Sequence, residues 1–341
     1  MRAARIFEDL SLRIEELDVP APGPGEVLVR IHAAGVCGTD LHILDGMIKP
    51  DPYPMTIGHE AAGVVEAVSD GAGLTPGDRV AVYNKIFCGT CEQCLAGRPN
   101  VCDGEPGQLG FNTDGGDAEY VVVPARNLVR VPPPVDFATA AVLTCAGMTA
   151  VHATKVSGLG LGNTAVVNGI GGVGILMVQA ARAAGARVIA VADSAQKREL
   201  ALAHGAADGV IVAGEQDYGT LPGTVRELTG GRGVDVFFEL VGTTETMTAG
   251  IRCLAKGGTF VSTGYTDQPL NIHPIELILS ESSLVSTVAA TRQDLADALQ
   301  MAASGAMTVP IAGRYPLDGV HGALDALRKR AVLGRQVLEL G

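Results

Sequence analysis

The first third of the chain is dominated by short segments in which apolar side chains recur at every second position. After the proline- and glycine-rich turn at 20–25, Val27, Val29 and Ile31 alternate with positions that include Arg30. A period of two is typical of β-strands. The pattern therefore predicts a largely β domain, with strands at Val27–Ile31, Ala61–Val68, Arg79–Tyr83 and Glu119–Val123.

The pattern changes near Asp136, which is predicted to cap an alanine-rich helix. From Asn163 onward, near-continuous apolar runs of strand length alternate with helix-forming segments, including Val173–Ala184 and Ala195–His204. Such runs are typical of parallel strands that are buried on both faces. The strands are expected at Ala165–Asn168, Val188–Ala192, Val210–Val212, Val234–Leu240 and Thr259–Thr263. This order predicts an α/β fold with a doubly wound parallel sheet.

The length of 341 residues favours two domains. Beyond about Val288 the pattern becomes irregular again, and we expect the tail to return to the first domain. The expected division is 1–146 with 289–341 for the discontinuous first domain, and 147–288 for the second.

Composition and charge narrow the class of protein. Hydrophobic residues make up 47% and charged residues 18%, which is typical of a globular chain. The formal net charge of −12 argues against a nucleic-acid partner. The N-terminus has no apolar signal core, and apolar runs such as 175–184 are interrupted before they could span a bilayer. We therefore expect no membrane association and a cytoplasmic location with reduced thiols.

Four cysteines lie within fifteen residues, at Cys88, Cys91, Cys94 and Cys102. Short loops between them allow four thiolates to surround one tetrahedral zinc ion at ~2.3 Å. Two disulfides are the alternative, but these are typical of small secreted domains, and this chain is neither small nor fitted with a signal peptide. The spacing predicts a structural zinc site.

A glycine-rich loop follows the expected strand Ala165–Asn168 directly and leads into a helix. The spacing of its glycines suits a dinucleotide loop: Gly169 forms the turn, Gly171 lets a pyrophosphate approach, and Gly174 lets the helix pack on the strand. The loop is completed by Gly172 and Val173. Glycines that serve only close packing are the alternative. The context predicts a dinucleotide site at the start of the helix.

Asp193 comes nineteen residues after Gly174, at the end of the next expected strand. Its carboxylate is predicted to accept hydrogen bonds from the adenine ribose and to repel a 2′-phosphate, which favours NAD over NADP. Lys197 and Arg198 are close and leave NADP as the alternative. The alternative role of Asp193 is a helix N-cap for Ser194–His204, and the two roles are compatible with each other.

Two further motifs precede the cysteine loop, and the four motifs follow one another along the chain in a characteristic order. The two further motifs are Gly35-Val-Cys37-Gly-Thr39-Asp40-Leu-His42 and Gly58-His59-Glu60. Together with the cysteine and glycine loops, they resemble the zinc-dependent medium-chain alcohol dehydrogenases along nearly the whole chain. The resemblance implies a mainly β, GroES-like catalytic domain, a Rossmann coenzyme domain and a cleft between them.

The resemblance also implies roles for individual residues. Cys37, His59 and Cys145 match the catalytic zinc ligands, which gives two zinc ions per chain. Asp40 matches the carboxylate that orients the histidine ligand, and Glu60 matches an acidic residue behind the metal. Further matches are Thr149 at the nicotinamide and Arg335 at the pyrophosphate.

Thr39 and His42 match a proton relay from the substrate hydroxyl to solvent. The alternative is a helix-capping threonine and a surface histidine.

Two positions depart from the family pattern. Gly38 stands where many relatives have Arg or His, and Ala192 occupies the usual position of the ribose-binding acid. The remaining cysteine, Cys253, is expected to be a small buried side chain.

The implied reaction is reversible oxidation of an alcohol to an aldehyde or ketone, with hydride transfer to NAD. A polyol, amino-alcohol or sugar dehydrogenase, or a carbonyl or imine reductase, is the alternative. Asn84 and Lys85 favour a polar substrate, although a solvated loop explains them equally well. A non-catalytic zinc- and nucleotide-binding redox sensor is a more distant alternative. A homodimer or homotetramer, formed near Leu284–Val288, is implied by the resemblance.

Overall fold

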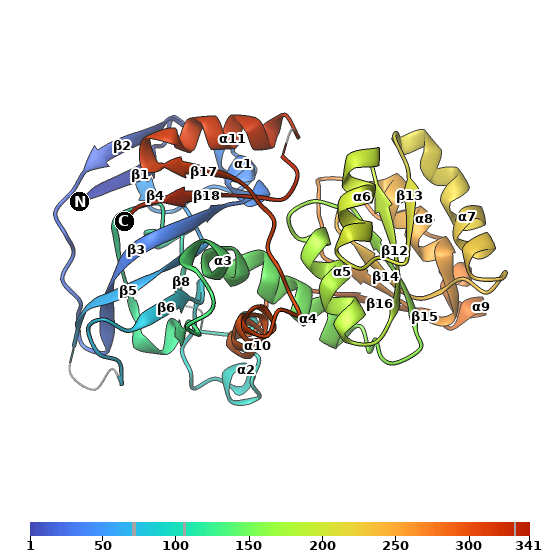
Figure 1. The fold of residues 1–341 in the computed structure, drawn as a ribbon, viewed down its shortest axis with the longest axis horizontal. Helices are drawn as coiled ribbons and strands as arrows, with labels where there is room; N and C mark the ends of the chain where they lie inside the picture. Colours follow the sequence, from blue (N-terminus) through green and yellow to red (C-terminus); the bar gives the residue numbers. More distant parts are fainter. Residues whose placement is uncertain (70–72, 105–106, 331) are drawn as a thin grey trace. The chain divides into compact units, whose positions relative to one another are not determined.

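The computed structural model of the chain describes residues 1–69, 73–104, 107–330 and 332–341. The chain divides into two compact units (Figure 1). The first comprises Met1–Met148 and Thr291–Gly341, and the second comprises Thr149–Ala290.

The first unit is built on β-sheets. A seven-stranded sheet runs in the order β10-β6-β5-β3-β18-β17 with β9 also paired to β3, and a three-stranded sheet runs β2-β1-β4. Its strands are β1 (Arg2–Ile6), β2 (Leu12–Glu16), β3 (Glu26–Val36), β4 (Met55–Thr56), β5 (Ala61–Val68), β6 (Arg79–Val82), β7 (Lys85–Ile86), β8 (Gly107–Gln108), β9 (Tyr120–Pro124), β10 (Leu128–Arg130), β17 (Ile311–Pro316) and β18 (Arg335–Glu339). The helices are α1 (Gly38–Leu44), α2 (Glu92–Leu95), α3 (Phe137–Val142), α10 (Arg292–Ala303) and α11 (Val320–Arg328).

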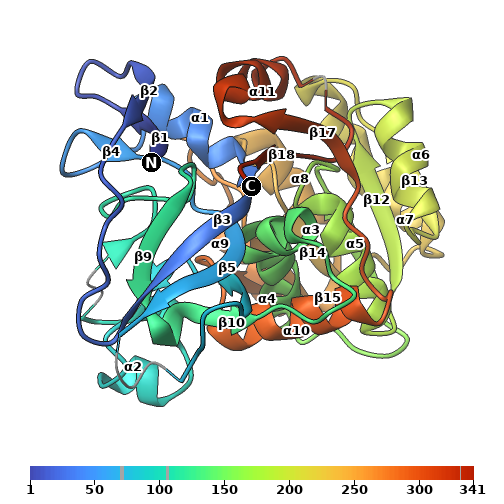
Figure 2. The ribbon, with the colours of Figure 1, turned by 60° about the vertical axis from the view of Figure 1, so that its left-hand side comes forward.

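The C-terminal tail belongs to the first unit because β18 pairs antiparallel with β3, with Gln336 opposite Val36 and Glu339 opposite Ala33. In Figure 2 the red C-terminal strands and the blue N-terminal strand lie in the same region of the molecule. This pairing brings Arg335 beside the end of β3, next to Cys37.

The second unit is a parallel sheet with the strand order β13-β12-β11-β14-β15-β16. Its strands are β11 (Thr164–Asn168), β12 (Arg187–Ala192), β13 (Asp208–Ile211), β14 (Val234–Glu239), β15 (Leu254–Ser262) and β16 (Ser283–Ser286). The helices are α4 (Met148–Val156), α5 (Gly174–Ala183), α6 (Ala195–Ala203), α7 (Leu221–Leu228), α8 (Thr244–Cys253) and α9 (Pro274–Ser280). The predicted α/β class, with a mainly β unit and a doubly wound parallel sheet, is confirmed.

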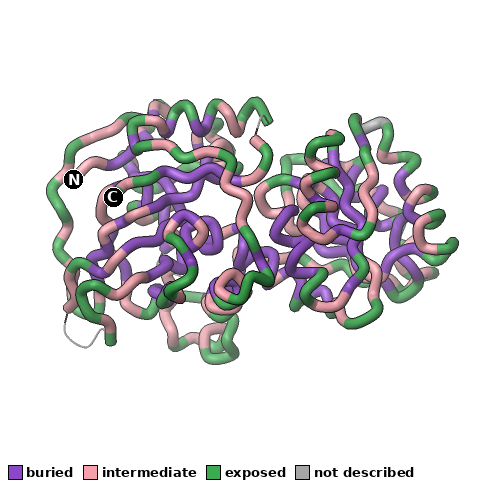
Figure 3. The backbone as a smooth tube through the Cα atoms, viewed as in Figure 1, coloured by how far each residue is buried: buried purple, intermediate pink, exposed green. Residues whose placement is uncertain are grey.

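The inner strands of both units are buried, as Figure 3 shows in purple. In the second unit Val166, Ile189, Phe237 and Phe260 form the centre of one apolar core and are each at most 1% exposed. This burial explains why the strands of the sheet are almost continuously apolar in sequence.

Several predicted elements differ from the structure at their ends; strand β3, for example, continues to Val36, past its predicted end at Ile31. Strand β15 begins at Leu254, five residues before the predicted Thr259, because Gly257 takes a positive φ of 75° and lets the strand continue through a register shift. Asp136 does cap a helix, with Oδ1 accepting from the N–H of Thr139 at 2.6 Å. That helix continues through Val156; it is long and apolar enough to cross a membrane, but 72% of its most apolar window is buried, as in a core helix.

Candidate metal centres and cofactor loop

The first metal centre gathers side chains from three separate segments of the first unit. Cys37 lies between β3 and α1, His59 lies just before β5, and Cys145 lies in a π-helical turn, Leu143–Gly147, between α3 and α4. One ligand atom each from Cys37, His59, Glu60 and Cys145 lies within 4.8 Å of all the others. Such π turns are rare and occur frequently at functional sites.

The motif glycines make room for this cluster. A side chain at Gly35 would place its Cβ 2.0 Å from Oε2 of Glu60. Gly58 has a positive φ of 93°, and a Cβ there would lie 2.1 Å from Oδ1 of Asp117. Both positions therefore require glycine, which is why the two short motifs carry one each.

Asp40 holds two of the ligands in place. Its Oδ2 accepts the backbone N–H of Cys37 at 2.8 Å, and its Oδ1 lies 3.3 Å from Nδ1 of His59. Asp40 and His59 are 1% and 4% exposed. Because Nδ1 faces the carboxylate, Nε2 is the nitrogen left to bind a metal, as in other carboxylate–histidine–metal arrangements.

The two thiols also fit a metal. The hydrogen bond from Cys145 holds the pKa of Cys37 well below its usual range and raises that of Cys145, so the pair shares one proton. A divalent ion favours the thiolate form of both ligands. Cys2His with a position left for substrate is a set of ligands suited to catalytic zinc.

Glu60 and Arg335 form a buried ion pair behind the ligands. A guanidinium N–H of Arg335 donates to Oε1 of Glu60, and the arginine and glutamate are 5% and 0% exposed. Burial raises the pKa of Glu60 to about 7, although Arg335 opposes the rise. Arg335 is therefore not the solvated side chain that a lone arginine near a strand would suggest. Its predicted contact with the cofactor pyrophosphate stays a prediction.

The four-cysteine loop forms a second compact cluster in the first unit. All four thiols are free, and their sulfurs are 3.5 Å (Cys88–Cys102), 3.8 Å (Cys91–Cys102) and 3.9 Å (Cys88–Cys94) apart. Four sulfurs at ~2.3 Å from a tetrahedral zinc would be separated by about 3.8 Å, whereas a disulfide needs about 2.05 Å. The cluster fits one structural zinc and not two disulfides.

The glycine loop lies between β11 and α5. Gly169 has a positive φ of 99°, a Cβ on Gly174 would lie 2.0 Å from the carbonyl of Gly169, and nothing lies within 4 Å of the corresponding position at Gly171. Helix α5 begins without a side-chain cap at Val173. Gly169 therefore forms the turn, Gly171 leaves space for a ligand, and Gly174 allows close packing, as predicted. The first N–H groups of α5 are suited to binding phosphate.

A buried network of polar side chains supports this loop, and no pattern in the sequence indicated it. Asn168, the last residue of β11, donates from Nδ2 to Oε2 of Glu239 at 2.8 Å and accepts at Oδ1 from the hydroxyl of Tyr218 at 2.9 Å. Oε1 of Glu239 accepts from the N–H groups of Val241 and Gly242 at 2.7 and 2.8 Å. The network lies where the strand order reverses, between β11 and β14, which is where such sheets bind ligands.

Asp193 directly follows β12 and forms an ion pair with Lys197, at 2.7 Å between Oδ2 and Nζ. Its side chain is 43% exposed. Helix α6 is capped by Ser194, whose side chain accepts from the N–H of Lys197, so the capping role considered for Asp193 is wrong. Asp193 is therefore available to the ribose, with a lysine beside it.

The remaining predicted residues lie on helices. Thr39 and His42 are both on α1, and Oγ1 of Thr39 is 3.7 Å from Sγ of Cys37. Thr149 is the second residue of α4 and is 9% exposed. Cys253 is fully buried, as expected of a small core side chain.

Asn84 makes contacts beside the metal ligands that the sequence did not indicate. It is 2% exposed, so the solvated-loop interpretation is wrong. Its Nδ2 donates to the carbonyls of His59 at 3.1 Å and Thr144 at 3.4 Å. A polar residue two positions after the apolar strand β6 was the only sequence signal for these contacts.

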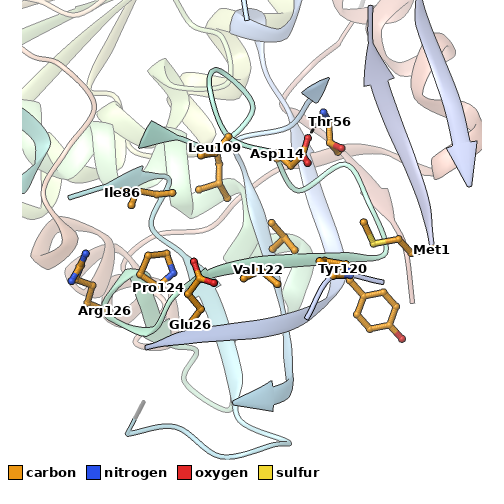
Figure 4. Close-up of a pocket in the computed structure, with 14 residues that line it drawn as sticks. Met1, Glu26, Thr56, Ile86, Leu109, Asp114, Tyr120, Val122, Pro124 and Arg126 are labelled. Atoms are coloured by element: carbon orange, nitrogen blue, oxygen red, sulfur yellow. Dashed lines mark hydrogen bonds between the residues drawn. The ribbon is translucent and has the colours of Figure 1, made fainter. Parts of the chain in front are cut away.

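A cavity of about 450 Å³ is also present in the first unit (Figure 4). Ile86 and Leu109 lie at one end of it, and Tyr120 and Met1 lie at the other. None of its lining residues is a predicted metal ligand, so its size alone does not make it the site of chemistry.

Two family models match consecutive parts of this chain. The family model "Alcohol dehydrogenase GroES-like domain" matches residues 23–133, and the model "Zinc-binding dehydrogenase" matches residues 172–304. The NAD-dependent alcohol dehydrogenase of Saccharolobus solfataricus is 34% identical over 350 residues, covering 99% of both chains.

Solved structures show the same likeness. The alcohol dehydrogenase of Aeropyrum pernix superposes with a TM-score of 0.91 at 34% identity, covering 99% of this chain and 100% of that one. The D-arabinose dehydrogenase of Sulfolobus solfataricus superposes with a TM-score of 0.85 at 27% identity, covering 99% and 98%. With full-length relatives above 30% identity and both family models matched, the chain belongs to the zinc-binding medium-chain alcohol dehydrogenase family of oxidoreductases.

Proposed function

We propose that the protein oxidises an alcohol reversibly to an aldehyde or ketone, with NAD as the hydride acceptor and zinc held by Cys37, His59 and Cys145. The observation that carries the proposal is the convergence of these three ligands, from three segments, within 4.8 Å. Zinc bound there would supply Lewis acidity at the substrate oxygen, and NAD would supply the hydride acceptor.

The surrounding side chains orient the ligands and move the proton. Asp40 fixes the ring of His59 and the backbone of Cys37. Oγ1 of Thr39, beside Sγ of Cys37, both donates and accepts, so it relays a proton from the substrate hydroxyl. His42, one helical turn further along α1, passes the proton to solvent.

A second zinc, held by Cys88, Cys91, Cys94 and Cys102, has a structural role. The N–H groups of Cys88 and Cys91 point at sulfurs of the cluster, at 3.3 Å each, which favours thiolates. NAD is favoured over NADP because Asp193 stands at the end of β12, where a carboxylate binds ribose hydroxyls.

A polar substrate, such as a polyol, sugar or amino alcohol, is the second candidate. Oδ1 of Asn84 is a buried acceptor without a hydrogen-bond partner among the described residues, next to two ligand-bearing segments. A donor on the substrate would satisfy it. The likeness to a D-arabinose dehydrogenase supports the same class.

One assay tests the proposal and separates the two candidates. Purified protein is supplied with NAD or NADP and with matched pairs of n-alcohols and 1,2-diols, and cofactor reduction is followed by its ultraviolet absorbance. Zinc is measured on the same sample. Two zinc ions per chain and turnover that is lost on adding a chelator support the function. A single zinc in fully active protein would refute the two-site assignment.

We also infer a homo-oligomer formed through the second unit. Strand β16 is an edge of the parallel sheet, and Leu284 on it is 40% exposed. On the preceding helix α9, Ile278 and Leu279 are 74% and 73% exposed. An exposed apolar edge is typical of strands that pair with a second copy.

Free thiols at all seven cysteines favour a reducing compartment such as the cytoplasm.

A further inference from the structure

Asn84 connects two segments that carry metal ligands and are far apart in sequence. Its Nδ2 donates to the carbonyl of His59, which is itself a ligand, and to that of Thr144, which precedes Cys145. Of the two polar atoms in an asparagine side chain only the nitrogen donates, so the two carbonyl partners determine the orientation of this amide. The side chain therefore fixes the distance between the His59 and Cys145 backbones.

Asn84 is itself held from both sides. Nδ2 of Asn127, a fully buried residue, donates to the carbonyls of Tyr83 and Lys85 at 2.8 and 2.7 Å. The carbonyl of Asn84 accepts the N–H of Leu109 at 3.0 Å. Because hydrogen bonds fix the backbone on each side of Asn84, its side-chain amide is held in one position relative to its two carbonyl partners.

Asn84 also lies at the base of the four-cysteine loop. Strand β7 begins at Lys85, directly after Asn84, and pairs with β8, so that Lys85 is opposite Gln108 and Ile86 is opposite Gly107. The four cysteines lie between these two strands. Figure 4 shows Ile86 and Leu109, from the two sides of this stem, close together.

The geometry points to Asn84 as a positioning residue that links the two metal centres. The metal in the four-cysteine loop holds the β7–β8 stem, the stem holds Asn84, and Asn84 holds the His59 and Cys145 segments at the spacing the other metal requires. This inference rests on the metal-binding part of the proposed function. Loss of a partner that orients a ligand commonly lowers metal affinity by about 10–100-fold.

The test replaces zinc with Co²⁺ at both centres, since cobalt–thiolate and ligand-field absorption bands report ligand geometry directly. Metal loss to a chelator is followed in wild type, in Asn84→Leu, which keeps the size and removes the donors, and in Asn84→Gln, which keeps an amide. Asn271→Leu is the control, because it makes the same change at an exposed asparagine of the second unit, away from the stem and from both metal centres. Cys145→Ser removes a ligand of the catalytic centre and so identifies which kinetic phase of metal loss belongs to that centre.

We expect Asn84→Leu to accelerate metal loss from the catalytic centre by about 10–100-fold and to shift its absorption bands. Metal loss from the four-cysteine loop should be unchanged, Asn84→Gln should be intermediate, and Asn271→Leu should match wild type. Unchanged bands and rates in both Asn84 variants would overturn the inference. If wild type bound only one cobalt, the proposed function would fail instead, so the two failures are distinguishable.

A double-mutant comparison tests the link to the cysteine loop. Cys91→Ser removes a ligand of the loop metal and should accelerate metal loss at the catalytic centre in the wild-type background. It should add almost nothing in the Asn84→Leu background, because the connection is already broken. Equal effects in both backgrounds would refute the link.

Discussion

The Asn168–Glu239 network gives a prediction whose size can be calculated. Oε2 of Glu239 accepts from Nδ2 of Asn168, and both side chains are fully buried. Asn168→Asp would replace the donor with a second carboxylate, at hydrogen-bond distance from the first. Two adjacent buried carboxylates do not both ionise, so the new acid would remain protonated in the folded state, with its pKa raised.

The cost follows from the pH. An unfolded Asp has a pKa of about 3.9, and each pH unit above that value adds about 1.36 kcal/mol to the free energy of keeping the acid protonated. This free energy is therefore about 4 kcal/mol at pH 7 and about 1.5 kcal/mol at pH 5. Because the folded pKa is raised above the unfolded one, stability is retained below about pH 4 and is lost as the pH rises.

A second substitution should reverse the loss. In Asn168→Asp/Glu239→Gln, the new amide donates to the new carboxylate, which still accepts from the hydroxyl of Tyr218. Oε1 of the glutamine still accepts from the N–H groups of Val241 and Gly242. Each of these hydrogen bonds thus has a counterpart in the double variant, which should lie within about 1–2 kcal/mol of wild type at pH 7.

Hydrogen exchange of the β11 and β14 amides, measured by mass spectrometry at pH 5 and pH 7, reports the opening free energy of this region alone. Asn271→Asp is the control, because it makes the same substitution at an exposed position of the same unit, where the new acid can ionise in water. Wild-type protection of Asn168→Asp at pH 7, or no recovery in the double variant, would refute the reasoning.

The other predictions concern the metals, the cofactor, the relay and the assembly. Cys91→Ser should lower zinc from two ions to one per chain by metal analysis, and an unchanged content would contradict the four-thiolate site. Asp193→Gly should raise kcat/KM for NADP relative to NAD by at least about tenfold, since it removes the carboxylate and frees Lys197; wild type that already prefers NADP would contradict this. Thr39→Ala should lower kcat by ~10²–10⁴-fold while Thr39→Ser retains most activity, and full activity in Thr39→Ala would exclude the relay. Leu284→Lys should dissociate the oligomer in light scattering, and an unchanged mass would place the interface elsewhere.

The sequence predicts best what depends on neighbours in the chain. The glycine loop and the four-cysteine loop could be recognised because turn geometry and ligand spacing are local, and β5 occupies the predicted range Ala61–Val68. Asn168 and Glu239 are seventy-one residues apart and meet only because β11 and β14 are adjacent strands. No period or spacing in the sequence specifies that adjacency.

The role of Asn84 could not be predicted for a related reason. A single asparagine after a strand is usually a turn residue, and its partners at His59 and Thr144 come from segments before and after it in the chain. The pairing of Glu60 with Arg335 is likewise a product of the β3–β18 ladder. Such contacts become visible only when the strand order is known.

The π turn at Leu143–Gly147 makes the metal centre sensitive to chain length as well as to residue identity. A π turn holds one residue more than an α-helical turn would. Deleting one residue there would restore a regular α-helix with the flanking segments close to their present orientations, because the π turn takes up the extra residue within itself. Cys145 lies inside the turn, so the deletion would change the backbone that presents its thiol to Cys37 and His59. A one-residue deletion at this turn would thus preserve the helix and abolish the chemistry, so length variation among functional relatives should avoid it.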